Sequence, residues 1–290
     1  MRALKLLAGL LLAQLLAGSA LADCTPRSLR LAVIPIKSNE EMVREHQALL
    51  QRLSQAAGVP VELVIAASYE AVVDAVVSGG ADIARLGPAS YVLAHRRDPG
   101  IEPFATFTLS AGPFTPAGSH YHSLLLARSD TSADLDALRG KRVALSDPAS
   151  TSGSLVPSVE FPSEVGTPLP QFFGSLVYAG THDKALEALL DGRVEAAFVA
   201  SERVDAYLAR HALAPATLKV LWRSRPIQYD PYVFSASLCP ALKQRIRQAM
   251  LDDPEALTGF VASQDASGLV PVSQADYDPL QKMMDAALPR

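Results

Sequence analysis

A run of hydroxyl residues closed by a glycine, Ser150-Thr151-Ser152-Gly153, is the stretch of this sequence best suited to chemistry. It follows an apolar run at residues 142–145 that predicts a strand, and it leads into a short predicted helix. Backbone N–H groups and hydroxyls at a helix N-terminus point the same way, and the helix dipole adds partial positive charge. Such a turn could bind a tetrahedral oxyanion, but Ser and Thr here are equally typical of a plain helix cap.

Three further side chains could meet such an anion. His182 opens a helix at residues 180–183, among free backbone N–H groups, although capping by the neighbouring Thr and Asp is the competing interpretation. Tyr91 follows a Gly-Pro pair at a strand-to-helix junction and could donate its hydroxyl, but a half-buried core tyrosine is as common there. His46 lies within a predicted helix, where a surface histidine is more common than a ligand.

An enzyme or a metal site is the weaker interpretation of the same residues. Ser150 or Ser152 with His182 and Asp183 contains the residue types of a hydrolase triad. The sequence has no Gly-x-Ser-x-Gly elbow, however, and an adjacent His and Asp do not normally orient each other. The six histidines show no metal-ligand spacing. We therefore expect a protein without catalytic residues, metal or cofactor.

Alternating strands and helices predict an α/β fold. Strands are expected at residues 29–35, 61–66 and 81–86, with helices at 39–57, 69–77 and 89–96 between and after them. Units of this kind form a parallel sheet, in which ligands bind at the carboxyl ends of the strands. Residues 35–36, 68–69 and 87–91 would then lie on one rim. Residues 157–170 are rich in proline and are expected to be irregular.

Two polar, proline-bearing segments near residues 110–119 and 223–230 divide the chain. They bracket a middle block with its own alternation of strands and helices. The pattern predicts a discontinuous first lobe, residues 23–118 with 226–290, and an inserted second lobe, residues 119–225. Two lobes joined by two crossings form a cleft that can close by hinge motion.

The N-terminus predicts export. Arg2 and Lys5 precede an apolar core at residues 6–16, and Ala20-Leu21-Ala22 fits a signal peptidase site, so residues 1–22 are expected to be cleaved. That core is short for a membrane span. In an oxidising compartment Cys24 and Cys239 most simply form one disulfide, with two unpaired thiols as the alternative.

Charge and composition bear on the partners. The net charge of −4 is mildly negative, and the Lys and Arg residues are scattered, so the chain has no electrostatic footprint for nucleic acid. Nearly half of the residues are hydrophobic, which is enough for a sizeable core.

With these stretches in hand, the chain resembles the periplasmic phosphonate- and phosphite-binding proteins of ABC importers, from about residue 29 to residue 251. The motifs that carry the resemblance are Val-Ile-Pro at 33–35, Ala-Asp-Ile-Ala at 81–84, Gly-Pro-Ala-Ser-Tyr at 87–91, Asp-Pro-Ala-Ser-Thr-Ser-Gly at 147–153, Gly-Thr-His-Asp-Lys-Ala-Leu-Glu-Ala at 180–188 and Leu-Lys-Gln-Arg-Ile at 242–246. The hydroxyl turn together with the His-Asp helix start is fairly specific, whereas either alone is weak.

The resemblance implies a two-lobe type II periplasmic binding protein fold with a hinge and an interlobe cleft. The oxyanion, a phosphonate, phosphite or phosphate, would be held by Ser150, Thr151 and Ser152, with Tyr91 and His182 completing the cage. A monomer that delivers its ligand to a membrane permease is expected. A ligand sensor of the same fold that reports to a membrane receptor is the alternative, and a secreted serine hydrolase is the more remote one.

The sequence departs from the family pattern at three positions. His46 stands where family members often have a tyrosine, so that ligand contact would be altered or dependent on protonation. Ala200 stands where an acidic residue often meets the ammonium group of an aminoalkyl phosphonate, which argues against a strictly aminophosphonate-specific site. Arg85 replaces one of the usual aromatic residues before Gly-Pro, and it could supply a positive charge at the rim or face solvent.

Overall fold

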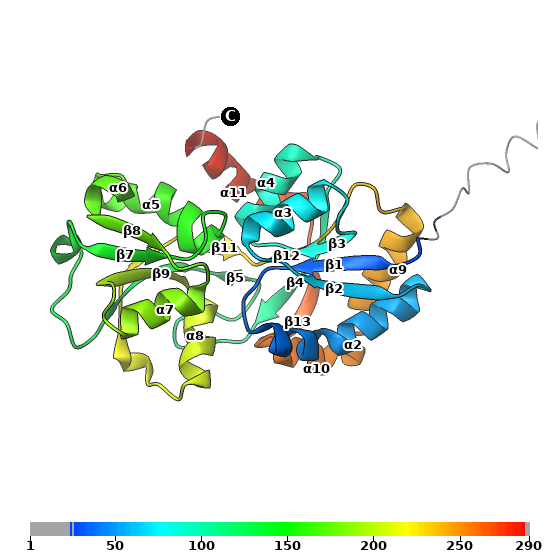
Figure 1. Cartoon of the computed structure of the whole chain (residues 1–290), viewed down its shortest axis with the longest axis horizontal. Coiled ribbons are helices and arrows are strands. Elements are labelled where there is room, and N and C mark those ends of the chain that lie inside the picture. Colours follow the sequence, from blue (N-terminus) through cyan, green and yellow to red (C-terminus); the bar gives the residue numbers. More distant parts are fainter. Residues whose placement is uncertain (1–23, 25, 288–290) are drawn as a thin grey trace, which may run out of the picture.

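The computed structural model describes residue 24 and residues 26–287, which form two sheets with helices on their faces (Figure 1). We call each sheet with its helices a lobe. The strand order is β13-β4-β12-β3-β1-β2 in the first lobe and β10-β6-β9-β7-β8 in the second. The chain enters the second sheet after its first four strands and later returns to add β12 and β13 to the first sheet.

The first lobe mixes strand directions. Its strands are β1 (Leu29–Val33), β2 (Val61–Ile65), β3 (Ile83–Arg85), β4 (Glu102–Leu109), β12 (Pro231–Phe234) and β13 (Ala266–Pro271). Strand β1 is parallel to β2 and β3, as predicted, but β12 is antiparallel to both β3 and β4, and β13 is antiparallel to β4. The expectation of a wholly parallel sheet is wrong because the returning chain enters the sheet from the opposite end.

Local signals explain where the helices of the first lobe begin. These helices are α2 (Asn39–Ala57), α3 (Tyr69–Val77), α4 (Pro88–Arg97), α9 (Pro240–Leu251), the 3₁₀ helix η4 (Pro254–Leu257) and α10 (Thr258–Ser263). The Ser38 and Ser68 hydroxyls each accept a backbone N–H of the first turn that follows, in α2 and α3 respectively. Helix α4 starts with Pro88, whose missing N–H costs nothing at that position.

The second lobe delivers the hydroxyl turn to its sheet edge. Its elements are β6 (Ser123–Arg128), η1 (Asp136–Leu138), β7 (Arg142–Leu145), α5 (Val156–Val165), α6 (Leu169–Phe172), β8 (Ser175–Tyr178), α7 (His182–Leu190), β9 (Ala196–Ala200), α8 (Ser201–Arg210), η3 (Pro215–Thr217) and β10 (Leu218–Arg223). Strand β7 is parallel to β8 and β9, so the turn after β7 and the starts of α7 and α8 meet at one edge.

Between the lobes, the two crossing segments pair with each other. Strand β5 (His120–Tyr121) and strand β11 (Ile227–Gln228) form an antiparallel ribbon of two residue pairs in the middle of the molecule (Figure 1). Tyr121 and Ile227 of this ribbon are buried, so the crossing between the lobes is itself packed against the core.

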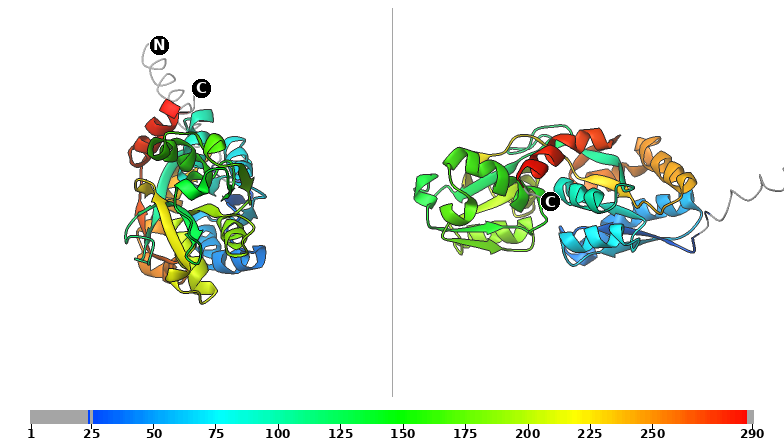
Figure 2. Two further views of the ribbon diagram at one scale, coloured as in Figure 1. Left: turned by 90° about the vertical axis from the view of Figure 1, so that its left-hand side faces the viewer. Right: turned by 90° about the horizontal axis from the view of Figure 1, so that it is seen from above.

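The last helix, α11 (Gln274–Ala287), lies over the junction of the lobes (Figure 2). It packs mainly on α4 of the first lobe, and it also contacts α5 of the second lobe and strand β11. The C-terminal part of the chain therefore touches both lobes, although β13 and α9 belong to the first.

The predicted disulfide is confirmed. Cys24 and Cys239 are bonded, with their Cα atoms 6.0 Å apart, and the bridge ties the chain just before β1 to the residue that caps α9. The expected signal peptide, residues 1–22, lies outside the described residues. In the part of the chain that the structure describes, no helix combines the length and apolarity needed to cross a membrane.

Candidate functional site

A closed cavity lies between the lobes at the predicted edge. The space within it that is open to the centre of a water molecule is only about 10 Å³, roughly what one water needs. The residues that line it are Ile34, Ile36, Tyr69 and Gly87 of the first lobe, Ser150, Thr151, Ser152, His182, Ala200, Glu202 and Arg203 of the second lobe, and Tyr121 and Asp230 of the crossing segments. Four of the six predicted site residues, Ser150, Thr151, Ser152 and His182, are thus brought together.

The hydroxyl turn is both a helix cap and part of the cavity wall. The Ser150 hydroxyl accepts the Gly153 N–H at 3.2 Å, and residues 151–155 then form a single wide π-helical turn before α5. Such turns are frequent at functional sites. The helix-cap interpretation is therefore confirmed, and oxyanion binding by the turn stays a prediction.

Only glycine fits at position 153. A Cβ atom there would lie 2.3 Å from the Ser146 hydroxyl oxygen and 3.0 Å from Cε1 of His182. The turn therefore packs directly against the histidine, and the glycine permits that approach.

The protonation of His182 follows from its neighbours. Its Nδ1 accepts the backbone N–H of Ala200 at 3.3 Å and lies 2.8 Å from the Ser146 hydroxyl. Because a backbone amide can only donate, Nδ1 carries no proton, so the neutral ring carries its proton on Nε2, 3.4 Å from the Ser150 hydroxyl. Burial and the nearby Arg203 guanidinium lower the pKa of His182 to about 3, which keeps the ring neutral near pH 7.

The structure does not place Asp183 where a catalytic triad would need it. The Asp183 carboxylate pairs with Arg210 rather than with the His182 ring. Since Nδ1 is occupied by a backbone amide and a hydroxyl, no carboxylate orients the histidine as a triad requires.

Tyr91 does not reach the cavity. Its side chain is fully buried in the first lobe, its hydroxyl donates to the Gln274 side chain of α11, and its ring packs edge-on against Tyr277 at 5.1 Å. The expected placement across the cleft is wrong because helix α4 turns this side chain towards α11. The tyrosines that do line the cavity are Tyr69 and Tyr121.

The residues just before Tyr91 join the lobes instead. The Ala89 N–H donates to the Thr151 hydroxyl at 2.8 Å, and the Ser90 hydroxyl donates to the Ala149 carbonyl at 2.8 Å. We call these the interlobe bonds. They use the start of α4 and the hydroxyl turn, so the turn contacts the opposite lobe as well as the cavity.

His46 also lies away from the cavity. It is buried in α2, where its Nδ1–H donates to the Met42 carbonyl at 2.7 Å and its ring packs edge-on against Phe260 at 5.4 Å. Among the described residues, Nε2 has no hydrogen-bond partner. The placement of His46 as a ligand contact is wrong, because its face of α2 packs against α10 instead.

His46 should make folding sensitive to acid. Burial lowers its pKa from 6.5 to about 4, so its contribution to stability is present above pH 6.5 and is lost as the pH falls towards 4. We expect His46→Phe to gain about 1.4 kcal/mol relative to the wild type for each pH unit below 6.5, or about 2 kcal/mol at pH 5. Urea unfolding at pH 7.5 and pH 5.0 would measure this. A parallel loss in both proteins would contradict it.

The sequence interpretation missed the acidic residues of the site. It examined Ala200 and expected no carboxylate after β9, but Glu202 lies two residues further on, in the first turn of α8, and Asp230 enters from the second crossing. The rule that ligands meet the carboxyl ends of parallel strands could have pointed to Glu202. Tyr69 was predicted to lie at the carboxyl edge of the first sheet, but no contact with a ligand was predicted for it.

Burial acts strongly on these carboxyl groups. It raises the pKa of Glu202 to about 8, against the opposing effect of Arg203, and Asp230 and Arg85 act on Glu202 more weakly. Burial also raises the pKa of Asp230, while Arg85 and Arg203 act to lower it. Burial therefore disfavours a free negative charge on either carboxyl group, and the neighbouring arginines oppose this effect.

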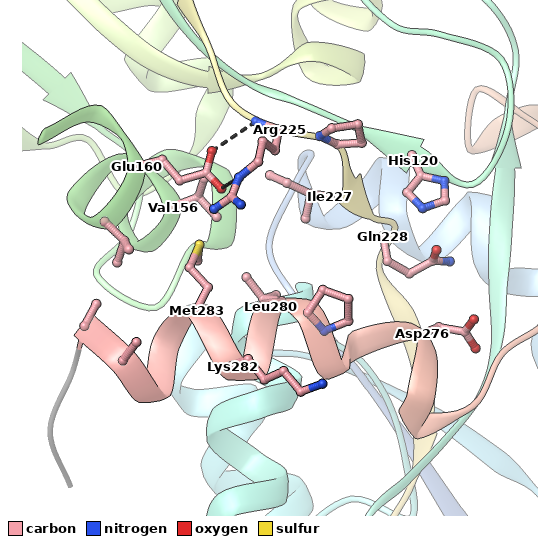
Figure 3. Close-up of a pocket in the computed structure, with 15 residues that line it drawn as sticks. His120, Val156, Glu160, Arg225, Ile227, Gln228, Asp276, Leu280, Lys282 and Met283 are labelled. Carbon is pink, nitrogen blue, oxygen red and sulfur yellow. Dashed lines mark hydrogen bonds and ion pairs between the residues drawn. The ribbon is translucent and has the colours of Figure 1, made fainter. Parts of the chain in front are cut away.

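A second hollow, the hinge groove, lies outside the cavity (Figure 3). It has a volume of about 600 Å³ and runs between α11, α5 and strand β11, with the Arg225 guanidinium 3.1 Å from the Glu160 carboxylate on one side. It contains none of the six predicted site residues. Among the described residues, no group of three or more His, Cys, Asp or Glu is arranged to hold a metal ion.

Comparison with known proteins places this geometry in a family. The profile of the family described as "ABC transporter, phosphonate, periplasmic substrate-binding protein" matches residues 31–277. The chain belongs to this family. Its members are substrate-binding proteins rather than enzymes, so the hydrolase alternative is not favoured.

Individual phosphonate-family relatives agree in sequence and fold. A protein named phosphate-import protein PhnD, from Mycolicibacterium smegmatis, is 28% identical over 290 residues, covering 92% of this chain and 88% of the relative. A binding-protein component of a Pseudomonas aeruginosa ABC phosphonate transporter has a TM-score of 0.80 at 21% identity, covering 91% of this chain and 87% of that one. PhnD1 from Prochlorococcus marinus, solved with methylphosphonate, has a TM-score of 0.76 at 15% identity, covering 90% and 98%. The type II periplasmic binding protein fold is confirmed.

Proposed function

We propose that this protein captures a small phosphorus oxyanion, a phosphonate, phosphite or phosphate, in the cavity between its lobes and delivers it to the permease of an ABC importer. The observation that carries the proposal is the convergence of the hydroxyl turn and His182 on one closed cavity. Membership of the phosphonate-binding family supports it.

The hydrogen-bond donors that remain free at the cavity favour an anionic ligand. The Ser150 oxygen already accepts the Gly153 N–H and faces Nε2–H of His182, so its own proton is the one it can give to a ligand. Ser152 lies in the same turn, and the Tyr121 phenol lies beside Thr151 and Ser152. Several neutral donors on the walls of a small buried cavity bind an anion strongly, because the low dielectric strengthens each hydrogen bond.

The proposal extends to location and assembly. The precursor would be exported and cleaved after Ala22, leaving a monomer with one lobe of residues 23–118 and 226–290 and another of residues 119–225. Such lobes would close on the ligand by bending at the β5–β11 ribbon. The closed form would then be the one that the permease recognises.

A calorimetric and thermal-shift screen tests the ligand class. Phosphate, phosphite, methylphosphonate, aminoethylphosphonate and sulfate would each be added to the purified mature chain. A true ligand at about 100 times its Kd should stabilise the fold by about 2.7 kcal/mol. If no phosphorus oxyanion gives a shift or a heat of binding, the proposal fails.

Ser152→Ala should weaken binding of the best ligand by about 1.5–3 kcal/mol, because a charged acceptor loses one hydrogen bond. Isothermal titration of wild type and variant would measure the difference. The matched control is Ser158→Ala, which removes an exposed hydroxyl of α5 that bonds only the Ser154 carbonyl. Equal affinity in all three proteins would mean that the turn is only a helix cap.

A further inference from the structure

Two ion pairs lie at the cavity, and three of their four members, Glu202, Arg203 and Asp230, line it. The Glu202 carboxylate lies 3.6 Å from the Arg203 guanidinium, and the Asp230 carboxylate lies 3.7 Å from the Arg85 guanidinium. Both arginine side chains are at most 9% exposed. A charged side chain this well buried needs a partner of opposite charge, because burial alone would strongly destabilise it. Each pair therefore stabilises the charges that lie at the cavity.

The two arginines differ in what they can reach. Arg85 does not line the cavity. Its guanidinium donates hydrogen bonds to the Gln264 side chain at 2.9 Å and to the Tyr229 hydroxyl at 3.3 Å, and it lies over the Phe107 ring. It therefore neither faces solvent nor supplies charge at the rim, and its role is to compensate Asp230.

Arg203, by contrast, lines the cavity. Of the described residues in that lining it is the only lysine or arginine, and its charge acts both on His182 of the same lobe and on Tyr69 of the opposite lobe. It comes from the first turn of α8, next to Glu202 in the chain. An anion in the cavity would therefore meet one full positive charge in addition to the neutral donors.

The carboxyl groups cannot offer a free negative charge to a cationic ligand. Glu202 is paired with Arg203, and Asp230 is paired with Arg85. An ammonium group brought beside them would also approach the Arg203 guanidinium and be repelled.

We propose that Arg203 sets the specificity of the cavity, so that it prefers phosphorus oxyanions without a cationic tail, such as phosphate, phosphite and methylphosphonate, over those that carry an ammonium group. This inference rests on the proposed function and narrows its ligand class. It assigns the positive charge of the site to a residue outside the hydroxyl turn.

Titration of the wild type with methylphosphonate and with aminoethylphosphonate is the first test. We expect methylphosphonate to bind at least about tenfold more tightly, because only the aminated ligand meets charge repulsion. If both bind and aminoethylphosphonate binds as tightly or more tightly, this inference is overturned while the proposed function stands. If the chain binds no phosphorus oxyanion at all, the proposed function itself falls and takes the inference with it.

Removing the charge is the second test. Arg203→Met keeps the length of the side chain, and it should weaken methylphosphonate binding about tenfold or more and reduce the preference over aminoethylphosphonate. Arg203→Lys should keep most of the preference, since it keeps the charge. Arg193→Met is the matched control, because Arg193 is exposed and pairs only with Asp191 on the surface. An unchanged preference in a folded Arg203→Met protein would overturn the inference; if that variant does not fold, the wild-type ratio still decides.

Discussion

Replacing Gly153 with alanine should weaken binding of the phosphorus oxyanion at least about 100-fold, because two charge-assisted hydrogen bonds at about 1.5–3 kcal/mol each would be misdirected. The added Cβ would lie 2.3 Å from the Ser146 hydroxyl oxygen and 3.0 Å from the His182 ring. Both Ser146 and the turn must move, and Ser146 is one of the two groups that hold Nδ1 of His182. The hydroxyls of the turn and the ring of His182 would therefore both be displaced from the positions in which they face the cavity.

Isothermal titration measures this loss, and thermal unfolding reports whether the variant folds. Overpacking of this kind costs about 1–3 kcal/mol, which a protein of this size should survive. Gly259→Ala is the matched control, because a Cβ atom at Gly259 in α10 meets nothing within 4 Å. If Gly153→Ala binds like Gly259→Ala, the turn does not hold the ligand.

Removal of the disulfide should be the largest single loss of stability. The bridge between Cys24 and Cys239 closes a loop with a sequence separation of 215 residues, and loops of that length gain about 3–5 kcal/mol from a cross-link. We expect Cys24→Ser with Cys239→Ser to lower the free energy of unfolding by that amount in urea. Ligand affinity should be unchanged, because the bridge joins the chain before β1 to the start of α9, and neither cysteine lines the cavity; Figure 1 shows α9 at the end of the first lobe away from β5 and β11.

Reduction of the wild type provides the control for this variant. Wild type with a reducing agent should unfold at the same urea concentration as the double-serine protein, whereas the latter should not respond to the reducing agent. If the oxidised wild type and the double-serine variant unfold together, the bridge contributes nothing to stability.

Much of the fold followed from local signals in the sequence. Residues 39–57 are helical as expected, since Ser38 caps the helix and Gly58 ends it with a positive φ. The pairing of the two cysteines was also predicted correctly. Residues 157–170 were wrongly expected to be irregular: Pro157 lies in the first turn of α5, where proline is tolerated, and Pro162 is accommodated within the helix.

The site could be predicted only in part, because the sequence does not say which face of a helix meets the opposite lobe. The hydroxyl turn and His182 are both at helix starts after strands of one sheet, and strand topology alone brings them together. Tyr91 and His46 lie inside helices, where rotation and tertiary packing decide the direction of the side chain. Asp230 enters from the second crossing, so no local pattern could have related it to Arg85.

The interlobe bonds also have a consequence for the rate of ligand release. Because the Thr151 hydroxyl that accepts the Ala89 amide belongs to the same turn that lines the cavity, we expect the proposed ligand to leave only after the Ala89 and Ser90 bonds break. Ligand release and lobe opening would then occur at the same rate. The Ala89 amide proton, shielded only while the lobes are shut, is a natural probe for counting those openings by hydrogen exchange.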